Sequence, residues 1–195
     1  MNSTDNNFVS RAPEPSQLLV WADCEMTGLD ITEDTLVEIA LIVTDSELNL
    51  IDEGIDIVIQ ESAEKLDSMK DIVKKMHEKS GLTKEILKSN ISVSEAEQMC
   101  IDYLKKHGIK GGSAPLCGNS IGVDRRFLDK YMPKLEFFLH YRSVDVSSIK
   151  EMCRRWYPEI YAARPEKTGE HRALGDILGS IEEMKYYRDN IFISL

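Results

Sequence analysis

Several features are absent from this chain of 195 residues, and each absence excludes a class of protein. There is no run of about 18 apolar residues, so we expect no membrane-spanning helix and no membrane partner. We find no Walker A sequence, no dinucleotide-fold glycine pattern and no nucleophile elbow. Kinase, dehydrogenase and serine-hydrolase functions therefore have no support.

Cysteine is infrequent and follows no pattern. The four cysteines form no CxxC pair and have no zinc-type spacing with histidine; they are Cys24, Cys100, Cys117 and Cys153. Buried free thiols in a reducing compartment are the simplest interpretation. We therefore expect an intracellular protein, with cytoplasm and mitochondrion as the open alternatives.

Positive charge is scarce relative to negative charge. The chain has 24 Lys and Arg against 34 Asp and Glu, which gives a net charge of −10. A protein that grips long nucleic acid usually has a basic face, because neutralised phosphates supply most of the affinity. The balance argues against a long duplex partner but allows a small anionic ligand held by local cations and metal ions.

No Gly/Ser/Pro-rich stretch divides the chain, so the sequence predicts one domain over residues 17–195. Residues 1–16 are polar and include Pro13 and Pro15, and we expect a disordered lead-in there. A single arginine beside Asp5 and Glu14 makes this lead-in a poor transit peptide.

Strand and helix patterns alternate along the predicted domain. Apolar or alternating runs predict strands at Leu18–Glu25, Thr35–Thr44, Leu48–Ile59, Ala114–Cys117 and Tyr141–Val146. Helices are expected at Glu64–Glu78, Ser94–His107, Val123–Lys130, Ser147–Trp156 and Ala173–Arg188, with a polar loop at Pro165–Glu170. Ser94 and Glu97 fit a capping box. A strand hairpin followed by alternating helices and strands indicates an α/β layered fold with a mixed sheet.

Two acids stand at the end of the first predicted strand. Asp23 and Glu25 are two residues apart, so alternation places both side chains on one face of the sheet. Two adjacent carboxylates repel each other and need a cation between them, or one must stay protonated. A solvated strand end is the ordinary structural alternative for this pair.

Two more acids and a histidine occur where later elements begin. Asp124 opens the helix that follows the fourth strand, and His171 and Asp176 stand at the start of the last helix. Each also has a structural interpretation: Asp124 and Asp176 as helix N-terminal acids favoured by the dipole, and His171 as an exposed loop residue. His171 can reach the same site as Asp176 if it lies in the loop before the helix.

Taken together, four acids come from three separated places at strand ends or helix starts. Carboxylates of this kind hold two divalent ions roughly 3.5–4 Å apart, which stabilise the attacking and leaving oxygens in phosphoryl displacement. Oxygen ligands favour Mg²⁺ or Mn²⁺ over zinc. A histidine can accept the proton of the attacking water near neutral pH.

Four segments closely resemble one family of nucleases. They are DCEMTGLD at 23–30, CGNSIGVDRRF at 117–127, HYRSVDVS at 140–147 and HRALGDI at 171–177. The chain resembles the oligoribonucleases, a family in the DEDDh branch of the RNase H-like exonucleases, over about residues 18–192. The order and number of the motifs make a chance match very improbable.

The resemblance implies an RNase H-like three-layer α/β fold, with a five-stranded mixed sheet flanked by helices, in a homodimer. The implied activity is 3′→5′ hydrolysis of short single-stranded RNA of about two to five nucleotides, especially dinucleotides, to 5′-mononucleotides. Two Mg²⁺ or Mn²⁺ ions are implied as cofactors. The implied ligands are Asp23, Glu25, Asp124 and Asp176, and the implied catalytic residues are Glu25 and His171, with His171 as general base.

The resemblance also implies a substrate site closed around the short RNA. Leu29 would lie between the two bases, His77 near the 3′ end, and Tyr141 would reach in from the partner subunit, while the 5′ phosphate would be capped by Ser120, Arg142 and Ser147. Arg142 suits bidentate phosphate binding and Tyr141 suits base stacking. The structural alternatives are a core or interface aromatic for Tyr141, a surface cation for Arg142 and an exposed helix end for His77.

Two other functions remain as alternatives. A DEDDh proofreading or single-stranded DNA exonuclease would act on long DNA, which the acidic charge disfavours. A dinucleotide-binding module without catalysis would not need the intact carboxylates and His171. Metal-dependent release of a mononucleotide from a dinucleotide would distinguish both from an oligoribonuclease.

One position departs from the family pattern and gives a prediction. Ile72 stands where the family usually has a tryptophan, so an apolar contact is kept but a stacking face is lost. We expect dinucleotide binding to be weaker than in typical members, and Ile72→Trp to strengthen it by about 1–3 kcal/mol. Dinucleotide affinity measured on a hydrolysis-inactive background tests this, and an unchanged affinity would refute it.

Overall fold

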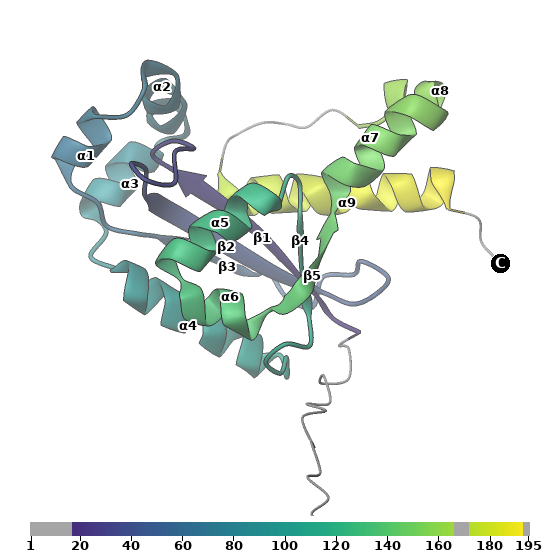
Figure 1. Cartoon of the computed structure of the whole chain (residues 1–195), viewed down its shortest axis with the longest axis horizontal. Helices are drawn as coiled ribbons and strands as arrows, with labels where there is room; N and C mark the ends of the chain where they lie inside the picture. The colour runs from purple at the N-terminus through teal and green to yellow at the C-terminus, as the bar shows by residue number, and fades with distance from the viewer. Residues whose placement is uncertain (1–16, 166–171, 193–195) are drawn as a thin grey trace, which may run out of the picture.

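The computed structural model describes residues 17–165 and 172–192. The predicted lead-in at 1–16, the loop residues after Pro165 and the candidate base His171 lie outside the described residues. The described part is a sheet with helices on both faces (Figure 1). Within it, no helix is both long and apolar enough to cross a lipid bilayer.

The sheet has five strands in the order β3-β2-β1-β4-β5. Their bounds are β1 Leu19–Met26, β2 Leu36–Thr44, β3 Ile55–Val58, β4 Pro115–Gly118 and β5 His140–Asp145. β1 pairs antiparallel with β2 and β2 with β3, whereas β4 pairs parallel with β1 and with β5. The predicted five-stranded mixed sheet is therefore confirmed.

β2 lies between β1 and β3 and is covered on both faces, because all nine of its residues are buried. This explains its nearly continuous run of Leu, Val and Ile, which differs from the alternation of a strand with one wet face. β1 is also largely buried, and Asp23 and Leu19 are its only residues of intermediate exposure. The two central strands thus form a rigid base for whatever side chains β1 carries.

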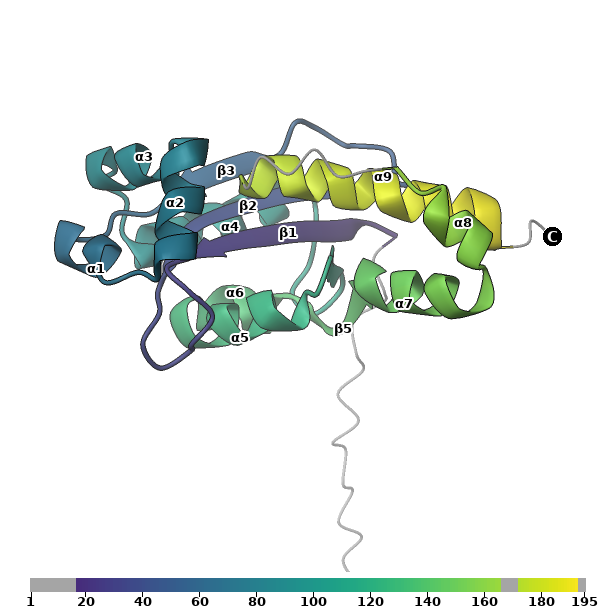
Figure 2. The same cartoon turned by 90° about the horizontal axis from the view of Figure 1, so that it is seen from above.

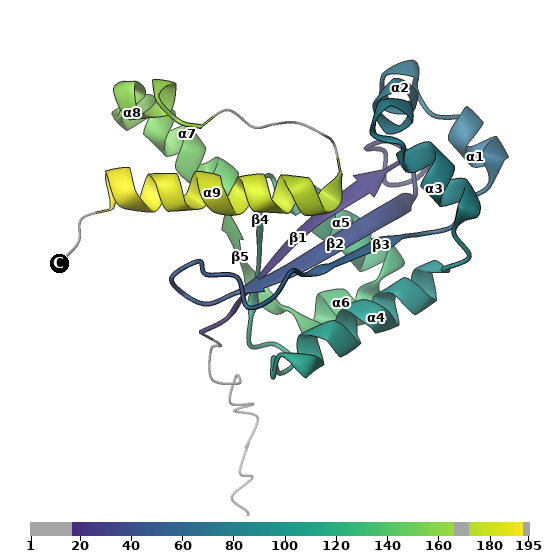
Figure 3. The same ribbon diagram turned by 180° about the vertical axis from the view of Figure 1, so that it is seen from behind.

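Helices form one layer on each face of the sheet. On one face, α4 (Val93–Lys106), α5 (Gly122–Tyr131) and α6 (Pro133–Phe138) share an apolar cluster with β1 and β2. On the other, α7 (Val146–Trp156) and α9 (Ala173–Ile191) pack around Trp21, Ala40 and Ile42 (Figures 2 and 3). Alternation along β1 therefore points Trp21, Asp23 and Glu25 toward the α9 layer.

Short helices surround one end of the sheet. The helix predicted at Glu64–Glu78 is interrupted, because the structure has α1 (Ala63–Asp67) and α2 (Asp71–Ser80) there. A further helix that was not predicted, α3 (Leu82–Lys88), follows. Gly81 links α2 to α3 with a left-handed φ of 83°, which glycine adopts without strain.

α6 and α8 (Pro158–Ala162) were not predicted, and each begins at a proline that is well suited to a first helical turn.

The third strand is shorter than the predicted Leu48–Ile59. Leu48 has a left-handed φ of 66°, and Leu50 makes only an isolated bridge to Thr44. The Asp45 carboxylate explains this, because it accepts hydrogen bonds from the backbone N–H groups of Glu47 and Asn49 and closes a turn. The hairpin exists, but regular pairing with β2 begins only at Ile55.

The predicted capping box at Ser94 and Glu97 is wrong by two residues. α4 begins at Val93, one residue before the predicted start, and its box is formed by Ser92 and Glu95. Glu97 is buried and serves another helix, since its carboxylate accepts hydrogen bonds from the backbone N–H groups of Lys134 and Leu135 at the start of α6. Ser94 and Glu97 match the capping-box pattern in sequence, but the Glu97 carboxylate is used in a contact with the distant helix α6.

This correction gives a matched pair of variants. Ser92→Ala removes the side chain that accepts from Glu95 N–H, so we expect it to lower the free energy of unfolding by about 1 kcal/mol. Ser94→Ala, two residues later on an exposed face, should change it by less than about 0.5 kcal/mol. Urea unfolding of both variants checks the assignment, and equal losses in the two would contradict it.

Candidate active site

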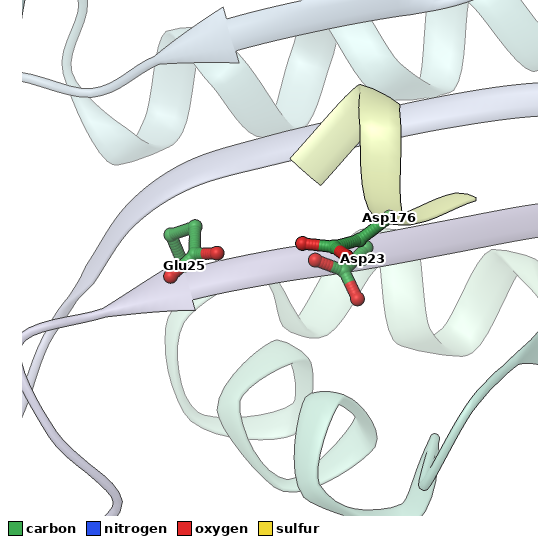
Figure 4. A group of neighbouring side chains, drawn as sticks. All are labelled: Asp23, Glu25 and Asp176. Carbon is green, nitrogen blue, oxygen red and sulfur yellow. The ribbon is translucent and has the colours of Figure 1, made fainter. Parts of the chain in front are cut away.

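Three carboxylates converge on the face of the sheet that α9 covers. Asp23 and Glu25 come from β1, and Asp176 comes from the first turn of α9. One carboxylate oxygen from each lies within 4.8 Å of the other two. Figure 4 shows Asp176 above Asp23, with Glu25 farther along β1. The structure therefore brings together three of the four acids that the sequence singled out.

The fourth acid, Asp124, lies at the edge of β1 and outside that group of three. β4 pairs only with Val20 and Trp21 of β1, so the backbone N–H of Cys24 has no strand partner on that side. Asp124 stands in the first turn of α5, and its carboxylate accepts this N–H at a distance of 3.1 Å. Cys24 stands between Asp23 and Glu25 in β1, so Asp124 lies adjacent to the acid cluster.

Burial and crowding make Glu25 and Asp124 hard to ionise. The pKa of Glu25 is raised to about 8, first by burial and then by the charges of Glu38, Asp176 and Asp124. The pKa of Asp124 is raised to about 7, mainly by burial. Groups in this state either hold protons or need a cation, and an all-oxygen set suits Mg²⁺ or Mn²⁺. The residues present therefore fit a divalent metal centre.

His77 lies behind Glu25 in the last turn of α2. It is fully buried, so the alternative of an exposed helix end is wrong. Its Nε2 lies 2.9 Å from the carbonyl oxygen of Met26 and therefore carries the hydrogen of that bond, while Nδ1 is 3.9 Å from Glu25 Oε2. His77 therefore lies on the side of Glu25 that faces the protein interior.

Beside the acids is an apolar cleft of about 290 Å³. Its lining residues are Cys24, Glu25, Met26, Gly28, Leu29, Ile72, Val73 and Met76. Leu29 and Ile72 are strongly exposed here, at 68% and 77%. Exposed aliphatic side chains next to buried acids make a surface that can contact the flat face of a base.

The loop that carries Leu29 is tied down by Asp34. The Asp34 carboxylate accepts hydrogen bonds from the Thr27 hydroxyl and from the backbone N–H of Asp30, both at 2.9 Å. A Cβ at Gly28 would lie 2.3 Å from an Asp34 carboxylate oxygen, so a larger residue there would displace this carboxylate from its hydrogen bonds. Sequence reasoning missed Asp34, although a glycine before an acid-rich loop was visible.

Ser120 and Ser147 form a joined polar turn. The backbone N–H of Ser120 donates to the Ser147 hydroxyl at 2.9 Å and to the Asp145 carboxylate at 3.0 Å. Ser120 has a left-handed φ of 55°, a conformation that these two bonds hold in place. The two serines, predicted from separate motifs, are thus brought together; Asp145, which also caps α7, was missed.

Asn119 connects that turn to α9. Its Oδ1 accepts from the Ser147 hydroxyl at 3.1 Å and from Lys150 at 3.3 Å, and its Nδ2 donates to Ser180 at 2.8 Å. Lys150 also pairs with the buried Glu183 at 2.9 Å. This network joins β4, α7 and the helix that carries Asp176.

Tyr141 and Arg142 lie on β5 and are exposed. Tyr141 is 74% exposed, so it is not a core aromatic of this chain. The Arg142 guanidinium lies 5.4 Å from the centre of the Tyr141 ring, and that ring stacks on His140. Both side chains are therefore available to a ligand or to another chain.

Known proteins with the same pattern are exonucleases. Residues 20–184 match the model of the RNase T family, described as exonuclease. The chain is 56% identical over 175 residues to an oligoribonuclease of Rhodococcus jostii, covering 90% of this chain and 88% of that protein. It is 53% identical over 179 residues to an oligoribonuclease of Leifsonia xyli, covering 92% and 86%.

Solved structures share the fold at low identity. The match to E. coli exonuclease I, solved in metal-free form with single-stranded DNA, has a TM-score of 0.65 at 16% identity. Exonuclease I of Methylocaldum szegediense gives 0.63 at 16%. This chain spans about two fifths of those proteins, 40% and 41%, and 90% of its own length is covered.

The raised pKa values predict how the metal-free protein responds to pH. Between about pH 5 and 8 the folded form holds protons on Glu25 and Asp124 that the unfolded chain has lost, because their pKa values rise from 4.5 to about 8 and from 3.8 to about 7. Stability contributed by these protons is present at low pH and is lost as pH rises through this window. We therefore expect the melting temperature in EDTA to fall from pH 5 to pH 8.

Two controls accompany that measurement. Glu25→Gln keeps the shape without the charge and should flatten the pH dependence, and saturating Mn²⁺ should raise the melting temperature most at pH 8. A melting temperature that rises steadily with pH in EDTA would contradict the assignment of raised pKa values to the cluster.

Proposed function

The chain belongs to the oligoribonuclease family of exonucleases, and from this membership we propose that it hydrolyses RNAs of about two to five nucleotides, dinucleotides above all, from the 3′ end to 5′-mononucleotides. The observation that carries the proposal is the convergence of Asp23, Glu25 and Asp176 within 4.8 Å beside an apolar cleft. Such a site combines groups for phosphodiester chemistry with a surface for bases.

Asp23, Glu25, Asp124 and Asp176 would hold two Mg²⁺ or Mn²⁺ ions. When bound, these ions supply charge stabilisation for the attacking and leaving oxygens of the phosphate. The charges of Glu38, Asp176 and Asp124 add to burial in raising the pKa of Glu25 to about 8. Occupancy by cations would relieve the repulsion that raises this pKa.

His171 would act as the general base. It accepts a proton from the attacking water as the water oxygen bonds to phosphorus, and the bond from phosphorus to the 3′ oxygen of the preceding nucleotide breaks. His171 lies outside the described residues, and its place in the chain, five residues before Asp176, supports the assignment.

Ser120, Arg142 and Ser147 would bind the 5′ phosphate and so limit the length of the substrate. Hydrogen bonds fix Ser120 and Ser147 side by side, and Arg142 is an exposed cation on the adjacent strand β5. Leu29 would lie between the bases, and Ile72 also lines that cleft. His77 would lie near the 3′ end from its buried place behind Glu25, without lining the cleft. A closed 5′ end excludes longer chains by shape.

A homodimer would complete the site, with Tyr141 reaching the active site of the partner. Its 74% exposure in the single chain, next to Arg142, supports this part of the proposal. An exposed aromatic is common at protein interfaces and at sites that stack bases.

Replacement of the base gives the first test. His171→Ala should lower kcat by about 10²–10⁴-fold while Mn²⁺ still binds, because the carboxylates remain. Single-turnover hydrolysis of a 5′-phosphorylated diribonucleotide measures the loss, and calorimetry measures Mn²⁺ binding. Near-normal turnover would remove the histidine from the mechanism.

Substrate length gives the second test. Turnover should be greatest for dinucleotides, should fall for RNAs of more than about five nucleotides and should vanish without Mg²⁺ or Mn²⁺. Ser147→Ala should reduce discrimination between 5′-phosphorylated and unphosphorylated dinucleotides, whereas Ser148→Ala, its exposed neighbour, should leave it unchanged. Faster turnover of long single-stranded DNA than of diribonucleotides would overturn the proposal in favour of a DNA exonuclease.

A further inference from the structure

A fifth carboxylate, Glu38, lies beside the acid cluster of Asp23, Glu25 and Asp176, but its hydrogen bonds go to the start of α9. It is opposite Glu25 in the pairing of β1 with β2, and it is fully buried. Its Oε1 accepts a hydrogen bond from Arg172 Nε at 2.8 Å, and its Oε2 accepts from the backbone N–H of Ala173 at 3.2 Å. Both oxygens are directed at the start of α9.

Glu38 supplies the cap that α9 does not provide for itself. The N-cap residue of α9 is Arg172, whose side chain makes no capping hydrogen bond. The first N–H groups of a helix need acceptors, and Ser, Thr, Asp or Asn usually provides one from the N-cap position. Here a carboxylate from β2 accepts the Ala173 N–H, and its negative charge also suits the positive end of the helix.

Arg172 connects the start of α9 to further elements, and Glu38, Arg172 and Glu85 together are called the anchor below. Its Nη1 and Nη2 donate to the two carboxylate oxygens of Glu85 in α3, at 3.2 and 2.8 Å. Its Nη2 also lies 2.7 Å from Glu38 Oε1 and 3.7 Å from Asp56 of β3. One planar guanidinium thus joins β2, β3, α3 and the first residue before α9, which a lysine could not do with the same geometry.

Arg172 of the anchor is one helical turn before Asp176 of the acid cluster. The backbone N–H of Asp176 donates to the carbonyl oxygen of Arg172 at 3.0 Å, the first helical hydrogen bond of α9. Any shift of Arg172 along or around the helix axis therefore moves Asp176. Only while Asp176 keeps its place do the three clustered acids lie within 4.8 Å of one another.

We propose that Glu38 and Arg172 are positioning residues whose ion pair fixes the start of α9 on β2. In doing so they set Asp176 against Asp23 and Glu25 for divalent-cation binding. The inference rests on the proposed function only in treating those acids as the metal ligands. Neither Glu38 nor Arg172 touches the cation or the RNA in this account.

A purely electrostatic role makes the opposite prediction. Arg172 carries a positive charge near a cation site, so its removal would by charge alone strengthen metal binding. If Arg172 acts by positioning, the same removal weakens metal binding. The sign of the change therefore separates the two roles.

The experiment is calorimetric titration of Mn²⁺, without RNA, into wild type, Arg172→Ala, Arg172→Lys and Glu85→Gln. We expect Arg172→Ala to weaken Mn²⁺ binding by about tenfold or more, a size typical for partners that orient metal ligands. Arg172→Lys, which keeps one ion pair, should fall between Arg172→Ala and wild type. Glu85→Gln, the control at the half-exposed outer end of the anchor, should stay within about twofold of wild type.

Kinetics add a readout that loss of stability alone would not produce. With saturating Mn²⁺, Arg172→Ala should recover most of its kcat, and KM for a 5′-phosphorylated diribonucleotide should change by less than about threefold. Arg172→Ala binding Mn²⁺ as tightly as wild type, or more tightly, would overturn the proposal. If Arg172→Ala does not fold, Arg172→Lys with wild-type affinity would overturn it equally.

The wild-type titration separates this inference from the proposed function. Absence of Mn²⁺ binding in wild type would defeat the metal-dependent function. Hydrogen exchange in the first turn of metal-free α9, Ala173–Ile177, would then decide the anchoring role by itself. Faster exchange in Arg172→Ala than in Glu85→Gln supports the anchor, and equal exchange contradicts it.

Discussion

Mutual repulsion among buried carboxylates is the constraint on which the rest of this structure depends. Asp23 and Glu25 share one face of a nearly covered central strand, and burial together with neighbouring charges raises the pKa of Glu25 to about 8. Such a cluster opposes folding unless protons or cations neutralise it. The fold tolerates it because β1 is flanked by the wholly buried β2 and by two apolar clusters, one on each face of the sheet.

Other buried acids show how the protein confines that repulsion to the site. Glu38 pairs with Arg172, Glu97 accepts two backbone N–H groups at the start of α6, and Glu183 pairs with Lys150 and the Tyr187 hydroxyl. Each of these acids receives strong donors from a different element, and a buried charge with such donors costs far less than an isolated one. Glu25 contrasts with them, because the neighbouring Glu38, Asp176 and Asp124 add to burial in raising its pKa.

Short-range patterns predicted the strands and the long helices, whereas the four acids were singled out only together and by the resemblance to a nuclease family. Alternation placed Asp23 and Glu25 on one face whatever the rest of the chain did. It could not assign Glu97, whose partners are 37 and 38 residues away, nor Glu38, which is hidden in an apolar run. The break between α1 and α2 and the separate helix α3 were missed, because Leu66, Leu82 and Ile86 pack with Val37 of β2 in a cluster that no local pattern shows.

An acidic enzyme that acts on a polyanion must confine attraction to a small area. The net charge of −10 repels RNA at long range, and screening limits that repulsion to about 8 Å at physiological salt. Under the proposed function, a short RNA would lie wholly in the site and contact the metal centre, Arg142 and the apolar cleft. Under the proposed function, the net negative charge and a closed 5′ end would act in the same direction, and both would favour the shortest substrates.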